Sequence, residues 1–171
     1  LSGRWKTSYV LAASIAQRYN LSVVALGYKA TDRLVAVQAH SPEQLKQLAT
    51  GEGGTATTAA ATLQIEACGL RDFQLWTVAP VLPNGWALLG EPGKWVRVSR
   101  QRFSGLEVAT AAARQAGHSG VTTAAGVDAA SANGTVTIHV QGGSGEPVTV
   151  DLMAPGGKLV RIQCELPQSG K

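Results

Sequence analysis

Three of the chain's four tryptophans, Trp76, Trp86 and Trp95, lie within a stretch of twenty residues. Aromatic residues make up only 5% of the chain, so this grouping needs a physical reason. A tryptophan can bury ~150–250 Å² of surface in a core. It can also stack on the apolar face of a sugar ring or on an exposed base. We therefore take Trp76, Trp86, Trp95 and the nearby Arg97 as candidate ligand-binding residues. The competing interpretation is that these rings seal the ends of a β-sandwich.

Positive charge next to Trp95 suggests a second kind of ligand. Lys94, Arg97, Arg100 and Arg102 fall within nine residues, and grouped cations beside an aromatic ring are typical of nucleic-acid binding. The whole chain carries a net charge of +4 and has a pI near 9.3. Such a mild excess also serves solubility alone. The alternative prediction is a basic module that binds nucleic acid or another anionic partner.

Evidence for catalysis or metal binding is weak. Glycoside hydrolysis needs two carboxyl groups ~5–10 Å apart, and Glu66 and Glu91, which flank the tryptophan-bearing strands, are the pair that we would test first. The three histidines, His40, His118 and His139, show no spacing typical of metal ligands,. We therefore predict no catalytic residue, no metal and no cofactor, and leave enzymatic activity uncertain.

Two cysteines, two glycosylation sequons and the lengths of the apolar segments bear on the protein's compartment and on membrane association. Cys68 and Cys164 are interpreted as two buried thiols, or as one disulfide between distant strands,. Asn20 and Asn133 lie in N-glycosylation sequons, so secretion is possible,. No apolar segment reaches the ~18–20 residues that a spanning helix needs, so no membrane span is expected.

Composition predicts one β-rich domain over 1–171, which could be a fragment of a longer protein. With 171 residues, 44% of them hydrophobic, the chain can bury a real core,. Only 15% are charged and 20 are glycine, which favours many strands and turns. Alternating apolar residues and short Gly/Pro turns predict an antiparallel β-sandwich. We expect strands at 21–27, 32–40, 62–67, 73–81, 86–90 and 94–99, and a three-stranded antiparallel meander at 135–167.

Two or three short helices are expected beside these strands. Residues 7–20 fit both a helical spacing and a strand alternation, and their alanines favour the helix. Ser41 and Pro42 mark a helix start, and Gly51 can end it. The segment 105–120 also has helical spacing, and we interpret 105–132 as an inserted helix followed by a linker of small residues.

The run "TLQIEACGLRDFQLWTVAPVLPNGWALLGE", with the hairpin-like tail "GTVTIHVQGG…PVTVDLMAPGGKLVRIQCEL", resembles a region of the raffinose synthase and alkaline α-galactosidase family of glycoside hydrolases. The matching features are a strand at 62–67, a "TVSPV"-type strand at 73–81 and a Gly-aromatic-Ala segment at 85–90. The similarity extends over about 32–166, with an alanine-rich insertion near 109–132. It implies a C-terminal antiparallel β-sandwich beside a catalytic barrel. The family's catalytic carboxylates belong to that barrel, which no part of this chain matches, so no catalytic residue is carried over.

These observations lead to one preferred function and two alternatives. The preferred function is a non-catalytic accessory or interaction domain, of the kind found in carbohydrate-active proteins, whose partner is a carbohydrate or a larger protein. The first alternative is the basic module described above. The second is a structural subunit of an assembly, with its tryptophans buried at an interface.

Overall fold

The computed structural model describes residues 6–29, 32–39, 41–48, 61–110, 126–131 and 134–167, without the side chains of 41–44, 110 and 126–131. The chain divides into two compact units, unit 1 (Leu1–Val81) and unit 2 (Leu82–Lys171), and each is described by itself. The described residues are mainly β, as predicted, and form several antiparallel sheets. The assignment of 1–171 to a single domain stays a prediction.

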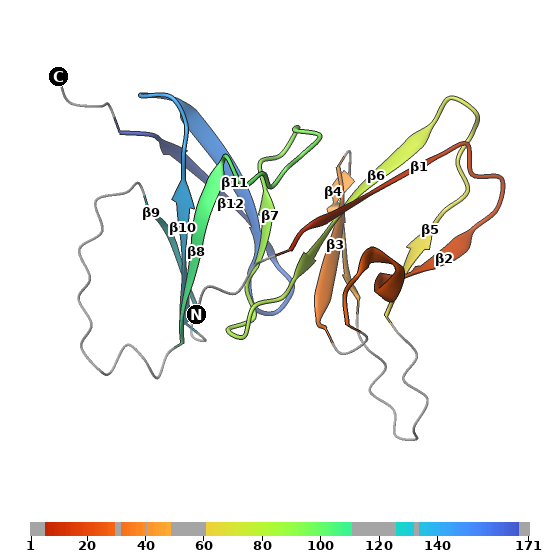
Figure 1. Ribbon diagram of the computed structural model, residues 1–171, viewed down its shortest axis with the longest axis horizontal. Coiled ribbons are helices and arrows are strands. Elements are labelled where there is room, and N and C mark those ends of the chain that lie inside the picture. Colours follow the sequence, from red (N-terminus) through yellow and green to blue (C-terminus); the bar gives the residue numbers. More distant parts are fainter. Residues whose placement is uncertain are drawn as a thin grey trace. The chain divides into compact units, whose positions relative to one another are not determined.

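Unit 1 is built on a four-stranded antiparallel sheet, sheet A (Figure 1). Its order is β1-β6-β3-β4, so β1 and β4 form the two edges. The interior strand β3 is buried on both faces, as its continuous apolar run predicts,. The strands are β1 (Ser8–Ala13), β6 (Phe73–Pro80), β3 (Leu34–Gln38) and β4 (Ser41–Leu48).

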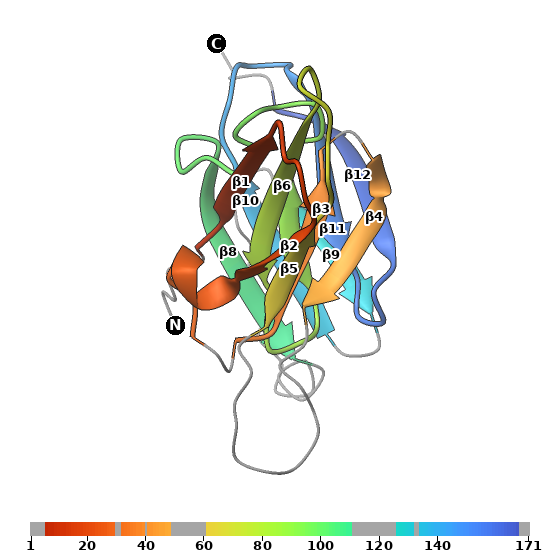
Figure 2. The same ribbon diagram turned by 90° about the vertical axis from the view of Figure 1, so that its right-hand side faces the viewer.

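A two-stranded antiparallel sheet of β2 (Tyr19–Ser22) and β5 (Thr62–Ile65) completes unit 1. In Figure 2 these strands lie in front of β3 and β6, and residues of β5 and of sheet A belong to one hydrophobic core. A short 3-10 helix, η1 (Val23–Leu26), follows β2 and ends at Gly27, whose φ of 78° suits glycine,. The strand predicted at 21–27 therefore stops at Ser22.

Unit 2 contains two three-stranded antiparallel sheets. In one of them β10 lies between β8 and β9, and alternate residues of β10, including Val136 and Ile138, are buried. In the other β11 lies between β12 and β7. The first sheet contains β8 (Phe103–Thr110), β10 (Gly134–Val140) and β9 (Gly126–Ser131), and the second contains β12 (Leu159–Glu165), β11 (Pro147–Met153) and β7 (Ala87–Gly90).

Two strand predictions need correction. The three predicted tail strands exist, but they do not form a meander, because β10 pairs with β8 and β9 while β11 pairs with β12 and β7. Period-2 alternation places a strand but does not choose its neighbour. The strand predicted at 94–99 is instead a series of bends, because this segment folds into a loop whose ends bond to each other.

The predicted helices were wrong. The described parts of their segments form β1 within 7–20, β4 within 41–51 and β8 within 105–120. Each of these strands has a long-range partner: β6 for β1, β3 for β4 and β10 for β8. Helix propensity is worth at most ~1 kcal/mol per ordinary residue, and tertiary pairing overrides it. Residues 111–125, where the rest of the third helix and the first part of the linker were expected, lie outside the described residues. The described part of the expected linker, Gly126–Ser131, is instead the strand β9, because it pairs with β10.

Candidate functional site

Trp76, the candidate in unit 1, belongs to the core. It is buried on β6, and its indole N–H donates to Gln74 Oε1 at 3.3 Å. The ammonium of Lys46, on β4, lies 4.9 Å from the ring centre, a cation–π distance,. The indole N–H of Trp76 thus has a hydrogen-bond acceptor inside unit 1, and the ring is in contact with a lysine of the same unit.

Trp86 belongs to unit 2 and is buried, with only 3% of its surface exposed. It follows the predicted turn at 83–85, which the Gly85 N–H closes by donating to Leu82 O at 2.8 Å. The Leu82 N–H then donates to Trp86 O at 2.7 Å. The indole N–H of Trp86 is buried without a hydrogen-bond acceptor among the described residues. The turn therefore directs this ring inward.

Arg97 is also an interior residue, and it is paired with a carboxylate. Its guanidinium donates to Asp151 Oδ2 at 2.6 Å, and both side chains are almost completely buried. Asp151, on β11, also accepts from the half-exposed Arg161 at 2.7 Å, so one carboxylate faces two arginines. An unpaired charge at this depth would be very costly, and Arg97 is therefore part of the framework of unit 2.

Trp95 is different, because 65% of its surface is exposed. It lies in the Trp95 loop, defined as residues 91–98, together with the exposed Val96. The loop is closed at its base by two bonds: the Glu91 N–H donates to Arg97 O at 2.9 Å, and Arg97 Nε–H donates to Glu91 O at 3.3 Å. A Cβ on Gly90 would collide with Arg97 O. The base of this loop is therefore closely packed while its tip presents an indole ring.

Arg102 anchors the same region of unit 2. Its guanidinium forms paired hydrogen bonds of 2.9 and 3.0 Å with Glu91 and of 2.7 and 3.0 Å with Glu146. The bonds from Arg102 to Glu146, together with one from the Gly143 N–H, lower the pKa of Glu146 to about 2. The hydrogen bonds to the two carboxylates raise the pKa of Arg102. Two arginines of the predicted cationic group, Arg97 and Arg102, are thus neutralised within the unit.

The acidic pair that we considered for catalysis is divided between the units. Glu66 belongs to unit 1 and pairs with Arg18 at 2.8 Å, and Glu91 belongs to unit 2. His139 Nε2, on β10, lies 3.1 Å from Glu107 Oε1 on the neighbouring strand β8. Among the described residues, His, Cys, Asp and Glu form no group of three that could hold a metal ion. His40 and His118 lie outside the described residues.

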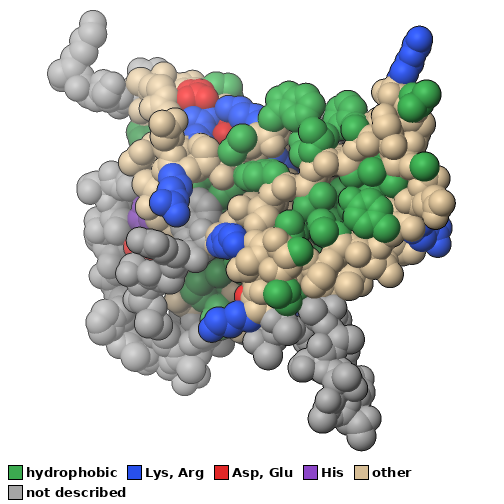
Figure 3. Space-filling model, turned by 45° about the vertical axis from the view of Figure 1, so that its right-hand side comes forward, with side chains coloured by type: hydrophobic (Ala, Val, Ile, Leu, Met, Phe, Trp, Pro, Cys, Tyr) green, Lys and Arg blue, Asp and Glu red, His purple; other side chains and the backbone are tan. Residues whose placement is uncertain are grey.

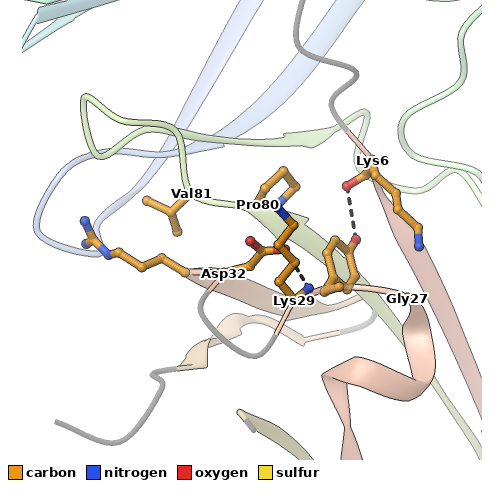
Figure 4. A pocket seen from close by; sticks show the side chains of 8 residues that line it. Lys6, Gly27, Lys29, Asp32, Pro80 and Val81 are labelled. Atoms are coloured by element: carbon orange, nitrogen blue, oxygen red, sulfur yellow. Dashed lines mark hydrogen bonds between the residues drawn. The ribbon is translucent and has the colours of Figure 1, made fainter. Parts of the chain in front are cut away.

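A pocket of about 270 Å³ opens in unit 1 (Figure 4). The Tyr28 hydroxyl lies 3.0 Å from Lys6 O and 2.9 Å from Val78 O, and burial raises the pKa of this tyrosine. The ammonium of Lys6 points toward Gly27 and donates to Leu26 O at 2.6 Å. It also lies 5.0 Å from the centre of the Tyr28 ring, a cation–π distance, so its charge contacts both the end of η1 and a residue that lines the pocket,. The lining residues are Lys6, Gly27, Tyr28, Lys29, Asp32, Arg33, Pro80 and Val81.

Both cysteines are free and half-buried, Cys68 in unit 1 and Cys164 in unit 2. Neither forms a disulfide, and the expectation of two buried thiols is corrected because each side chain is partly exposed. Asn20 is exposed on β2, and Asn133 lies outside the described residues. In the part of the chain that the structure describes, no helix has the length and apolar character for a membrane crossing.

Comparison of the chain with protein-family models, with curated proteins and with solved structures gave no match. The candidate site therefore depends on geometry alone. The structure brings Trp86, Trp95 and Arg97 into unit 2 and places Trp76 in unit 1. Sequence reasoning missed Asp151 and Glu146, because Asp151 lies 54 residues from Arg97 and Glu146 lies 44 residues from Arg102. No local pattern connects such distant partners.

Proposed function

We propose that this chain is a non-catalytic β-sandwich domain that recognises carbohydrate through the Trp95 loop. The supporting observation is the exposed indole of Trp95 on a loop whose base is tied by the Glu91–Arg97 bonds. A ring held on a stable base loses little conformational entropy when it binds, so more of the contact energy appears as affinity. The apolar C–H face of a sugar ring suits such a surface.

The arrangement of charge favours a neutral ligand over a polyanion. Arg97, inside the loop, is bound to Asp151, and Arg102, just after the loop, is bound to Glu91 and Glu146. Lys94, also inside the loop, pairs with Glu91 at 3.3 Å. The resemblance to the raffinose synthase family supports a role beside a carbohydrate-active enzyme. The assignment of Trp76, Trp86 and Arg97 to the ligand site stays a prediction, and their burial leads us to expect direct contact from Trp95 alone.

A panel of neutral oligosaccharides, including raffinose and stachyose, tests the proposal by calorimetry and by tryptophan emission. We expect at least one sugar to bind, and Trp95→Ala to weaken that binding about tenfold or more, since each tenfold step is ~1.4 kcal/mol. Trp95→Phe, which keeps an aromatic face, should retain part of the affinity. The matched control is Leu70→Ala, which removes an exposed apolar side chain from unit 1. Unchanged affinity in Trp95→Ala, or no binding by any sugar, would overturn the proposal.

The exposed Val96 favours a second candidate, a partner protein docked on the same loop. One sugar ring covers a single indole face, whereas two adjacent apolar side chains suit a larger contact. In that case the double variant Trp95→Ala/Val96→Ala would lose more affinity for the partner than Trp95→Ala alone. For a sugar ligand, we expect Val96→Ala to have little effect.

A further inference from the structure

The two edges of sheet A differ in how they are protected. The edge strand β4 contains Pro42, Glu43 and Lys46. Proline and charged residues on an edge strand discourage another strand from pairing with it. The opposite edge, β1, has the sequence SYVLAA, with no proline and no charge. Sheet A is thus protected at one edge and open to pairing at the other.

Other described edge strands are either charged or short. Charged residues occur in β8 (Glu107), β9 (Asp128) and β12 (Arg161 and Glu165). The strands β2, β5 and β7 lack charge but have four residues each, whereas β1 has six. Within the described part of the chain, β1 is therefore the longest edge strand without a charge.

Large apolar side chains are exposed on β1 and at the adjoining end of β6, whereas that face of β3 and of the rest of β6 is buried. Val10 and Ala12 point into the core of unit 1, so Leu11 lies on the other face,. Leu11 is 61% exposed and pairs with Leu75, and the neighbouring Phe73 is 38% exposed. Figure 3 shows hydrophobic side chains gathered on one face of unit 1. Contiguous exposed apolar side chains of this kind mark contact surfaces.

We propose that β1 is the contact through which two copies of this chain associate. The two β1 strands pair antiparallel about a two-fold axis perpendicular to the sheet, and the two copies of sheet A become one eight-stranded sheet. This inference concerns assembly and does not depend on the Trp95 loop.

The faces of the sheet restrict the register of this pairing. A two-fold axis perpendicular to the sheet leaves the outer faces of the two copies on the same side of the combined sheet. Residues directly opposite each other in a strand pair also point to the same side. The axis must therefore pass through a residue position, and Val10 and Leu11 are the two central ones in β1. A centre at Leu11 places this exposed leucine against its own copy and the large Tyr9 against the small Ala13. We assign the register Leu11–Leu11, with Tyr9 opposite Ala13.

A second copy fits this edge better than an unlimited stack of copies. Pairing β1 with itself brings no like charges together, because the strand has none. The eight-stranded sheet then has β4 at both ends, and its proline and charges resist further addition. Self-pairing about a two-fold axis thus closes at two copies.

Mass measurement tests the association. Sedimentation equilibrium of the 171-residue chain should show, as concentration rises, a species of twice the chain mass of 17.7 kDa. Leu11→Lys should remain at the monomer mass, because two ammonium groups would face each other across the axis. The control Val24→Lys, at a 50% exposed position on η1, should still form the dimer. Circular dichroism checks that both variants fold, and a dimeric Leu11→Lys or a wild type that stays monomeric would overturn the proposal.

Cysteine cross-linking tests the register in a Cys68→Ser/Cys164→Ser background. Opposite residues of antiparallel strands have Cα atoms ~4.5–5.5 Å apart, within the ~4.4–6.8 Å range of disulfides. Leu11→Cys should therefore oxidise to a covalent dimer. Tyr9→Cys should do so only together with Ala13→Cys. If Leu11→Cys cross-links no faster than the control Val24→Cys, β1 pairing is refuted. If the single variant Tyr9→Cys cross-links faster than Leu11→Cys, the Leu11 register is refuted.

Discussion

At the scale of single residues, burial separates the described tryptophans. Trp76 and Trp86 are interior and Trp95 is exposed, although all three come from one short stretch of sequence. The sequence suggested both roles for these rings, as core residues and as a ligand surface. Which ring takes which role depends on the direction of each turn, because the tight turn at 83–85 turns Trp86 inward while the longer loop leaves Trp95 at its tip.

We expect Trp86→Ala to destabilise the protein strongly. Replacing a buried tryptophan with alanine leaves a cavity and typically costs ~3–5 kcal/mol. Its indole N–H has no acceptor among the described residues, so we expect packing to account for the loss. Urea unfolding followed by circular dichroism measures the free energy of unfolding.

The matched control for this change is Trp95→Ala, at an exposed position. Surface substitutions usually change stability by less than about 0.5 kcal/mol. Equal unfolding free energies for the two variants would mean that Trp86 does not belong to the core. The sequence interpretation that used Trp86 as a binding residue would then regain its support.

At the scale of elements, one arginine ties several connections of unit 2 together. Arg102 precedes β8 and binds Glu91, which follows β7, and Glu146, which precedes β11. It also donates to Gln141 O, just after β10, at 2.8 Å. Elements from both sheets of unit 2 therefore depend on the ionised state of these groups.

Acid should weaken this connection through Glu146. Its pKa in the folded protein is about 2, below the usual 4.5, so its ionisation stabilises the fold at and above pH 4.5,. That contribution is lost as the pH falls from 4.5 toward 2. Glu146→Gln should be less stable than wild type at neutral pH, and the difference should shrink over this range. Urea midpoints measured across the range test this expectation.

The exposed Glu165, on β12, provides the control for the acid experiment. Glu165→Gln should leave the stability difference between neutral and acid pH close to that of wild type. Curves for Glu146→Gln and wild type that stay parallel from neutral pH to pH 2 would contradict the expected role of the Arg102–Glu146 pair.

At the scale of the whole molecule, net charge alone is a poor guide to partners. The chain carries +4, yet Arg97 and Arg102 are held by buried or half-buried carboxylates. A guanidinium already bound to a carboxylate has to break those bonds before it contacts a phosphate. The predicted cationic surface next to Trp95 is thus smaller than the sequence suggests.

We therefore expect weak, non-specific nucleic-acid binding. Fluorescence anisotropy with single-stranded and duplex oligonucleotides should show little association at physiological salt. A protein that neutralises Z phosphates shows a slope of about −0.9Z in log K against log salt for duplex DNA. A steep slope with tight binding would revive the basic-module alternative, and Arg100→Gln would then be the first variant to examine.

The sequence alone determined that this chain is mainly β and where many of its strands lie. Strand alternation is a local property, so β3, β5, β6, β7, β11 and β12 could be placed from neighbouring residues. Helix signals were also local, and in the described residues 41–48 and 105–110 they failed because these segments pair with other strands. Only the tertiary structure decided which strands pair, which tryptophan is exposed and which carboxylates hold Arg97 and Arg102. Those outcomes depend on contacts between residues far apart in the chain, which local patterns do not encode.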